Sequence, residues 1–273
     1  MINVKDISFK YAGQHRLLFD HFSLQLEENR IYGLLGKNGM GKSTLLYLIA
    51  GLLRPTVGQV CCDGIETQNR SAEILREMFL VPEEYDLPPM TLARYARLLE
   101  GFYPNFSHEV LERCLTDFEL GTDLQLQSLS MGQKKKVYMS LALAANTRYL
   151  LMDEPTNGLD IPSKSQFRKV VAENMSDDRT LVISTHQVHD VESLLDHIMI
   201  LTERELLLNA PVAELQERYA FGLRMPQEMD ESVIYAEPSL QGNAVMMHRT
   251  AGMAETQVNL ELLFNAVTKG LVK

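Results

Sequence analysis

The first third of the chain alternates apolar and polar side chains and ends this pattern in an apolar run. Apolar residues recur at spacings close to two between residues 2 and 26, and the run Ile31–Leu35 follows. Alternation is typical of half-buried strands, and a short apolar run is typical of a strand buried on both faces. The spacing then becomes helical over residues 45–49 and stops at Gly51. This order predicts an antiparallel β region, a buried strand and a helix.

The middle of the chain has a different period. From about residue 90 to residue 145 the apolar spacing is mostly helical, which predicts a helical subdomain. Strand-like and helix-like segments then alternate, with strands expected at 149–152, 181–184 and 197–201 and helices at 163–175 and 188–195. Such alternation is typical of an α/β fold with a mainly parallel sheet covered on both faces.

The pattern changes again after Pro211. A short helix is expected over 212–219, β-like pieces near 232–235 and 244–248, and a last helix over 260–268. A length of 273 residues suits one large domain with a small appendage. We therefore predict a main domain over 1–219 and a small C-terminal accessory region over 220–273.

Composition narrows the possible partners. The net charge is −10, which disfavours sequence-independent binding to nucleic acid or to an anionic membrane surface. The longest uncharged apolar stretch tested, residues 45–53, is far shorter than the roughly 20 residues of a membrane-spanning helix. The N-terminus lacks an apolar signal-peptide core, so we expect a cytoplasmic location. The three cysteines form no metal-type or disulfide pattern, and we interpret them as packing residues.

A phosphate-binding motif joins the predicted buried strand to the helix. Residues 36–43 read GKNGMGKS, which matches the pattern G-x-x-x-x-G-K-[ST]. Gly36 and Gly41 let the backbone wrap closely around phosphates. The N–H groups at the N-terminus of the following helix would stabilise the negative charge of these phosphates. Lys42 would place an ammonium at the β- and γ-phosphates, and the Ser43 hydroxyl would bind Mg²⁺.

Two carboxylates end a second strand of the predicted sheet. Asp153 and Glu154 follow the apolar run 150–152, and the carboxyl ends of parallel strands form the ligand-binding edge of α/β proteins. Asp153 suits an acid that organises Mg²⁺, directly or through water. Glu154 suits a general base for an attacking water molecule.

Residues 129–133, LSMGQ, lie between these two motifs and resemble the LSGGQ signature of the ABC ATPase family. The resemblance covers about residues 1–220 and includes other motifs in the family's order. Tyr11 resembles the aromatic residue that stacks on adenine, residues 157–160 resemble the D-loop, and His186 resembles the switch histidine.

The resemblance implies a P-loop NTPase core that binds ATP with Mg²⁺. It implies that Glu154 and His186 are catalytic, and that Ser43, Asp153 and Glu83 face the metal. It also implies that the nucleotide is bound by the aromatic, loop, signature and D-loop positions Tyr11, Gly36, Asn38, Gly39, Gly41, Lys42, Ser43, Thr44, Ser130, Gly132, Gln133 and Asp160.

Two positions depart from the family's pattern. Met131 stands where the commonest signature has its first glycine, and Glu83 stands where the Q-loop glutamine would align. A carboxylate at Glu83 can face Mg²⁺, but unlike the glutamine it cannot donate an amide hydrogen bond. The lysines at 134–136 oppose the dipole of the helix they open, and we interpret them as a solvated face.

The resemblance implies a motor that works in pairs. Two nucleotide-binding domains would close head to tail, each ATP lying between one chain's phosphate loop and the other's signature. A separate membrane permease would be the second partner, docked near Glu83 and residues 84–97, and would hold the chain at the cytoplasmic face of the membrane. The end of the chain, residues 259–264, resembles exporter-type subunits, which favours export. The alternative is a soluble ABC ATPase in iron–sulfur assembly or one acting on nucleic acid.

Overall fold

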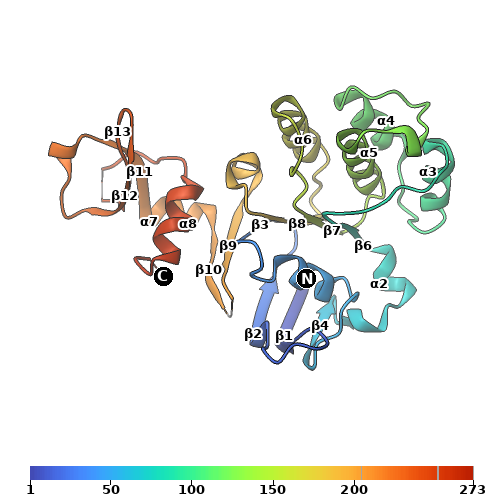
Figure 1. The fold of residues 1–273 in the computed structure, drawn as a ribbon, viewed down its shortest axis with the longest axis horizontal. Helices are drawn as coiled ribbons and strands as arrows, with labels where there is room; N and C mark the ends of the chain where they lie inside the picture. The colour runs from blue at the N-terminus through green and yellow to red at the C-terminus, as the bar shows by residue number, and fades with distance from the viewer. Residues whose placement is uncertain (204, 251, 273) are drawn as a thin grey trace.

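The computed structural model describes residues 1–203, 205–250 and 252–272. The N-terminal alternation forms a four-stranded antiparallel sheet in the order β2-β1-β4-β5, and Figure 1 shows β2, β1 and β4 side by side. In β1 the side chains of Ile2 and Val4 are buried, as are those of Phe22 and Leu24 on β2. The antiparallel region predicted from the sequence is thus present, built from β1 (Ile2–Phe9), β2 (Phe19–Leu26), β4 (Val57–Cys62) and β5 (Ile65–Glu66).

A six-stranded sheet in the order β10-β9-β3-β8-β7-β6 forms the centre of the molecule. Neighbouring strands are parallel except β10, which runs antiparallel to β9. The carboxyl ends of β3, β8 and β7 therefore meet at one edge, where the functional motifs follow them. The strands are β3 (Ile31–Leu35), β6 (Met78–Val81), β7 (Tyr149–Asp153), β8 (Thr180–Thr185), β9 (His197–Leu201) and β10 (Leu206–Pro211).

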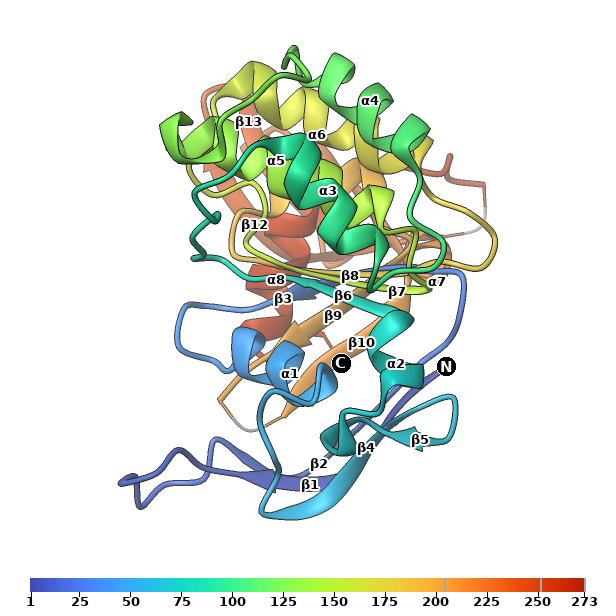
Figure 2. The same cartoon turned by 90° about the vertical axis from the view of Figure 1, so that its right-hand side faces the viewer.

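Both faces of this sheet are covered, and each face has its own core. In β3, Leu34 packs with α1 and the N-terminal sheet, whereas Leu35 packs on the opposite side with α5, α6 and α8. Figure 2 shows α5 and α6 on one side of the sheet and α1, α2 and the N-terminal sheet on the other. The bounds are α1 (Lys42–Ile49), α2 (Ala72–Arg76), α5 (Met131–Ala144), α6 (Ile161–Glu173) and α8 (Leu260–Thr268).

The helical subdomain lies where the sequence predicted it. It consists of α3 (Leu92–Glu100), α4 (His108–Asp117) and α5, at one end of the molecule in Figure 1. Thr91 and Ser107 cap α3 and α4 by accepting hydrogen bonds from the backbone N–H groups of Arg94 and Val110. A separate apolar cluster, which includes Leu92, Leu111, Leu115, Leu126, Val137 and Leu141, holds these helices together.

The prediction of a helix over residues 188–195 is wrong. This segment forms two 3₁₀ turns, η3 (Val188–Asp190) and η4 (Glu192–Leu194), separated at Val191. Apolar residues at 188, 191 and 194 repeat every three positions, which fits the 3₁₀ period of three as well as it fits an α-helix. The sequence analysis also missed β6 and β10. Other 3₁₀ turns are η1 (Thr67–Asn69), η2 (Leu126–Ser128) and η5 (Pro226–Glu228).

The C-terminal part forms a small unit with a separate sheet. After α7 (Val212–Arg218) comes a three-stranded antiparallel sheet in the order β11-β13-β12, and α8 ends the fold. The strands are β11 (Tyr219–Arg224), β12 (Val233–Ser239) and β13 (Gly242–His248).

Within residues 1–203, 205–250 and 252–272, no helix has the length and apolarity needed to cross a bilayer. Cys61, Cys62 and Cys114 are free and buried, and burial raises the pKa of Cys62 and Cys114 to about 12.

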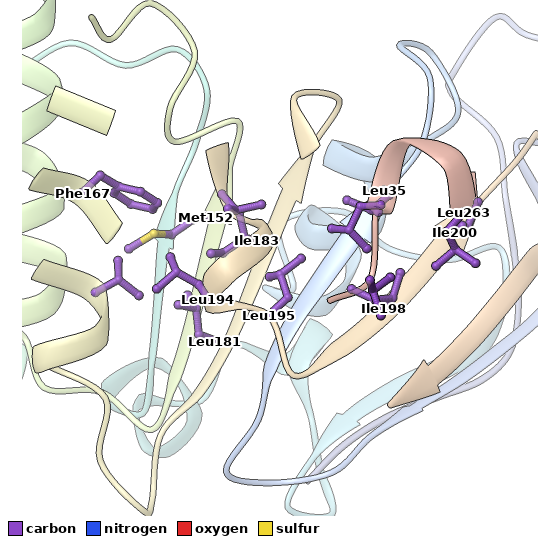
Figure 3. Packing of buried hydrophobic residues seen from close by; sticks show 14 of the residues in the cluster. Leu35, Met152, Phe167, Leu181, Ile183, Leu194, Leu195, Ile198, Ile200 and Leu263 are labelled. Atoms are coloured by element: carbon purple, nitrogen blue, oxygen red, sulfur yellow. The ribbon is translucent and has the colours of Figure 1, made fainter. Parts of the chain in front are cut away.

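Helix α8 ties this unit to the central sheet. Leu263 is buried in the same cluster as Leu35 and Ile200, and Figure 3 shows these three side chains close together. The backbone N–H of Leu260 also donates to Glu192 Oε1 at 3.0 Å. We therefore propose that residues 220–273 are an accessory region whose last helix completes the core of the main domain.

This arrangement predicts a shared unfolding transition. Leu263→Ala should lower the free energy of unfolding of the whole chain by about 2–5 kcal/mol, because it opens a cavity in the common core. Leu271→Ala is the control, since Leu271 is exposed and should change stability by at most about 0.5 kcal/mol. Urea titration followed by circular dichroism measures both variants. A separate early transition in Leu263→Ala, with the main transition unmoved, would contradict the shared core.

Candidate functional site

The phosphate loop, residues 36–41, links β3 to α1 and depends on its glycines. Gly41 caps α1 with a φ of +98°, in the left-handed region where a side chain is strained. A Cβ atom at Gly36 would lie 2.8 Å from the backbone oxygen of Leu201, so the close approach of the loop to β9 also requires glycine. The loop therefore brings the N-terminal N–H groups of α1 to the carboxyl edge of the sheet, where they favour an anion.

Lys42 is buried at the start of α1 and points back over the loop. Its Nζ donates to the backbone oxygen of Gly36 at 2.9 Å and lies 3.4 Å from Glu154 Oε1. The loop carbonyl and the carboxylate fix the ammonium before any ligand binds. The positive charge is thus held at the place where the loop directs its N–H groups.

Asp153 lies at the end of β7 with one carboxylate oxygen unused. Its Oδ1 accepts a hydrogen bond from the Ser184 hydroxyl of β8, whereas its buried Oδ2 has no hydrogen-bond partner among the described residues. Burial raises the pKa of this carboxyl, the hydroxyls of Ser184 and Ser43 lower it, and the nearby carboxylates Glu154 and Glu83 raise it further. An unsatisfied buried oxygen beside the phosphate loop marks a site for a positive ligand.

Glu154 is held in one orientation by the end of β8. Its φ is +46°, a strained value for a non-glycine residue. The Oε2 accepts from the Thr185 hydroxyl at 3.1 Å, and Oε1 accepts from the backbone N–H of His186 at 3.1 Å. The Nδ1 of His186 lies 2.8 Å from the same Oε1. The carboxylate is therefore a fixed acceptor close to Lys42, as a base that positions water must be.

A cavity of about 500 Å³ joins the phosphate loop, Glu154 and Tyr11. Tyr11 is partly exposed at this cavity, and its hydroxyl lies 2.8 Å from Thr44 Oγ1. Most of the residues that the sequence predicted to bind phosphate are thus brought together. The full lining is Tyr11, Gln14, Leu18, Asn38, Gly39, Gly41, Lys42, Ser43, Thr44, Glu83 and Glu154.

The signature residues lie elsewhere. Among the described residues that line the phosphate cavity, none belongs to 129–133. Ser130 caps α5 in a capping box, in which its hydroxyl accepts from the Gln133 backbone N–H and its own N–H donates to Gln133 Oε1. Met131 is 78% exposed, so this helix end presents itself to solvent. Asp160 is also outside the cavity and caps α6 by accepting from the Ser163 N–H at 2.9 Å.

Glu83 lies between the cavity at the phosphate loop and the signature end of α5. Its Oε1 accepts a hydrogen bond from Asn157 Nδ2 at 2.9 Å. It lines the phosphate cavity and also a smaller hollow beside Met131, Gly132 and Gly158. The carboxylate at this position therefore contacts the segment after β7 and faces the same space as Lys42.

The interpretation of residues 134–136 as a solvated face is wrong. Lys135 is only 8% exposed, and its Nζ donates to the backbone oxygens of Glu154 at 3.0 Å and Asn157 at 2.7 Å. Lys136 is half-buried and donates to Gln166 Oε1 at 2.9 Å. Helical spacing contained the missing clue, because Lys135 lies on one face with the buried residues Met139 and Ala142, at i+4 and i+7.

Comparison with known proteins agrees with this geometry. A family model described as ABC transporter matches residues 19–157. The chain is 30% identical over 225 residues to the bacitracin transport ATP-binding protein BcrA of Bacillus licheniformis, covering 80% of this chain and 72% of that protein. It is 31% identical over 229 residues to the methionine import ATP-binding protein MetN of Carboxydothermus hydrogenoformans, covering 79% and 67% of the two chains.

A solved structure of an ATP-binding cassette has a similar fold. It is the dimeric, post-hydrolysis state of an ATP-binding cassette bound to ADP and Pi, with a TM-score of 0.67 and 26% identity over 77% of this chain and 98% of that one. The phosphate loop, the paired carboxylates and the separate signature helix of the present chain occur together in this family's order. The chain belongs to the ABC transporter family, as an ATP-binding and ATP-hydrolysing subunit of such a transporter.

Proposed function

We propose that this chain is the motor of an exporter and that its catalytic sites form only between two nucleotide-binding domains. The observation that carries the proposal is the separation of the phosphate cavity from the exposed end of α5. A second domain turned head to tail would present its Ser130 and Gly132 to the γ-phosphate held by Lys42. The N-terminal N–H groups of α5, beside the exposed side chain of Met131, would then be the donors that the partner supplies.

Within one site, each predicted residue has a physical task. ATP would stack its adenine on Tyr11 and place its phosphates on the loop at Gly39, Gly41 and Lys42. Asp153 Oδ2 and the Ser43 hydroxyl fit Mg²⁺, which prefers oxygen ligands and would neutralise charge that develops on the phosphates. Glu154 would accept a proton from the attacking water.

His186 would stabilise the γ-phosphate, because it already contacts Glu154 and lines the same hollow as the loop residues Gly36 and Lys37. Hydrolysis in such a site relies on positioning and electrostatics, since phosphoryl transfer needs little covalent help from the protein.

A groove of about 680 Å³ between α2 and α3 suits a membrane subunit. It is mainly apolar, and its exposed members include Leu52 and Phe102, which is 68% exposed. Arg70 and Arg76 also line it. We propose that a short helix of the permease docks there. The groove lies beside the 84–97 region expected from the sequence, since Pro82 and Leu99 line it on either side of that region.

Phe102→Glu tests this docking. A buried charge in an apolar interface is costly, so a tagged Phe102→Glu chain purified from detergent-solubilised cells should retain at least about tenfold less permease than the wild type. ATP hydrolysis by the isolated variant should stay within a few-fold of wild type. Leu240→Glu is the control, because it adds the same charge at an exposed apolar residue far along the chain, in the turn between β12 and β13.

Mass spectrometry of the co-purified proteins distinguishes a transporter subunit from a soluble ABC ATPase. A polytopic membrane protein lost only in Phe102→Glu supports the proposal. Equal retention in both variants would place the docking site elsewhere, and ribosomes or soluble scaffold proteins in place of a permease would favour the soluble alternative. The direction of transport rests on the resemblance of residues 259–264 to exporter-type subunits, and it is measured by substrate movement in inverted vesicles that contain the complex.

A further inference from the structure

We propose that Lys135 couples the two nucleotide sites of the dimer, as a positioning residue that ties the signature helix to the backbone of Glu154. The inference rests on the proposed head-to-tail arrangement. In that arrangement the start of α5 contacts the ATP bound to the partner, whereas Glu154 acts on the ATP bound to its own chain. A physical link between these two parts of one chain would make each site sensitive to the other.

The link consists of one buried ammonium and two backbone carbonyls. Lys135 Nζ donates to the oxygens of Glu154 and Asn157, at 3.0 and 2.7 Å, on both sides of the turn after β7. Both oxygens lie in the segment between β7 and α6, which includes the strained Glu154 and the loop that precedes Asp160. Charge-assisted hydrogen bonds in a buried place are strong and directional, so they hold this segment against α5.

The position of Lys135 on α5 makes the link sensitive to the signature. Lys135 is the fifth residue of the helix and lies about one turn after Ser130 and Met131. A helix moves as a rigid body over this distance, so a shift of the signature caused by the partner's nucleotide moves Lys135 as well. The two carbonyls must follow, and the carboxylate of Glu154 turns with its backbone relative to Lys42 and His186.

The surroundings explain how a lysine can be buried here. Burial lowers the pKa of Lys135, while the carboxylates of Glu83, Glu154 and Asp153 raise it. The ammonium is therefore a buried charge that lies near the acidic groups of the catalytic site. Lys136, its neighbour, instead reaches Gln166 on α6 and the backbone oxygen and ring of Phe118, which lie outside the segment that carries Glu154 and Asn157.

Lys135→Met and Lys136→Met form a matched pair. Each removes one ammonium from the same helix, but only Lys135→Met releases the segment that carries Glu154. We expect the kcat for ATP hydrolysis by the purified full-length chain to fall by about tenfold in Lys135→Met, in the usual range of coupling effects. The dissociation constant for ATP, measured on the monomer without Mg²⁺, should stay within threefold. Lys136→Met should keep both values, and Lys135→Arg should recover most of the rate because it keeps charge and donors.

A double-mutant cycle separates coupling from a loss of local structure. Ser130→Ala removes the signature hydroxyl, and if Lys135 transmits the signature's state to Glu154, the rate loss in Ser130→Ala/Lys135→Met should be clearly smaller than the product of the single losses. Independent multiplication of the two losses would overturn the inference, as would a Lys135→Met rate equal to that of Lys136→Met. If Lys135→Met does not fold by circular dichroism, Lys135→Gln replaces it in the cycle, with the same outcomes. A wild-type chain that does not hydrolyse ATP would instead refute the proposed function.

Discussion

Glu154→Gln should lower the rate of ATP hydrolysis by about 10²–10⁴-fold, the usual contribution of a general base. The change removes the basic carboxylate but keeps one oxygen, which at the Oε2 position can still accept from the Thr185 hydroxyl at 3.1 Å and from the His186 backbone N–H at 3.4 Å. The orientation of the side chain should therefore survive. Single-turnover and steady-state phosphate release measure the loss.

ATP binding should not weaken in the same variant. A neutral amide replaces an anion that lies close to the site of the polyphosphate, which removes repulsion. With Mg²⁺ and ATP, Glu154→Gln should accumulate as a closed dimer that elutes earlier in size-exclusion chromatography than the nucleotide-free chain. Glu84→Gln is the control, because it is the same change at an exposed carboxylate nearby and should leave hydrolysis unchanged.

Two other outcomes would change the assignment. Hydrolysis at the wild-type rate in Glu154→Gln would mean that the base lies elsewhere. A variant that folds but neither hydrolyses nor dimerises would make Glu154 a structural or metal-site residue. The contact with His186 offers a reason for the first outcome, since a histidine beside the water could then take the proton.

Much of this site could be predicted because its motifs are local. The phosphate loop is one continuous segment whose glycines, lysine and serine have fixed tasks, and the strand before it has a clear apolar pattern. The carboxylates at 153 and 154 end a strand of the same sheet, so parallel topology alone brings them to the loop. The α/β class and the helical subdomain follow from periodicity in the same way.

What the sequence did not predict depends on contacts between distant residues. Lys135 belongs to a run of three lysines, which normally indicates a solvated face, and the two carbonyls that bind its ammonium lie 19 and 22 positions away in sequence. The two 3₁₀ turns at 188–194 share their apolar spacing with an α-helix. The packing of Leu263 on the central sheet could not be predicted either, because the sheet residues that share its cluster, such as Ala210, Ile200 and Leu35, are 53, 63 and 228 positions away in sequence.

Lys42→Met should raise the dissociation constant for ATP by at least about 100-fold. The variant keeps the length and most of the volume of the side chain but removes the charge. Two unit charges 4 Å apart attract by about 4 kcal/mol at an effective dielectric constant of 20, and about 2.7 kcal/mol corresponds to a factor of 100 in affinity. The ammonium is also already fixed by the Gly36 oxygen, so little ordering opposes its contact with phosphate.

Lys37→Met provides the matched control, since Lys37 belongs to the same loop but is exposed and should affect affinity only a few-fold. Isothermal titration calorimetry with ATP measures both variants. Lys42→Met should also remain monomeric with Mg²⁺ and ATP, in contrast to Glu154→Gln, because it loses the phosphate contact on which closure depends. Equal affinities of Lys42→Met and the wild type would mean that the buried lysine only neutralises Glu154, 3.4 Å away, and that the loop's N–H groups bind the phosphates without it.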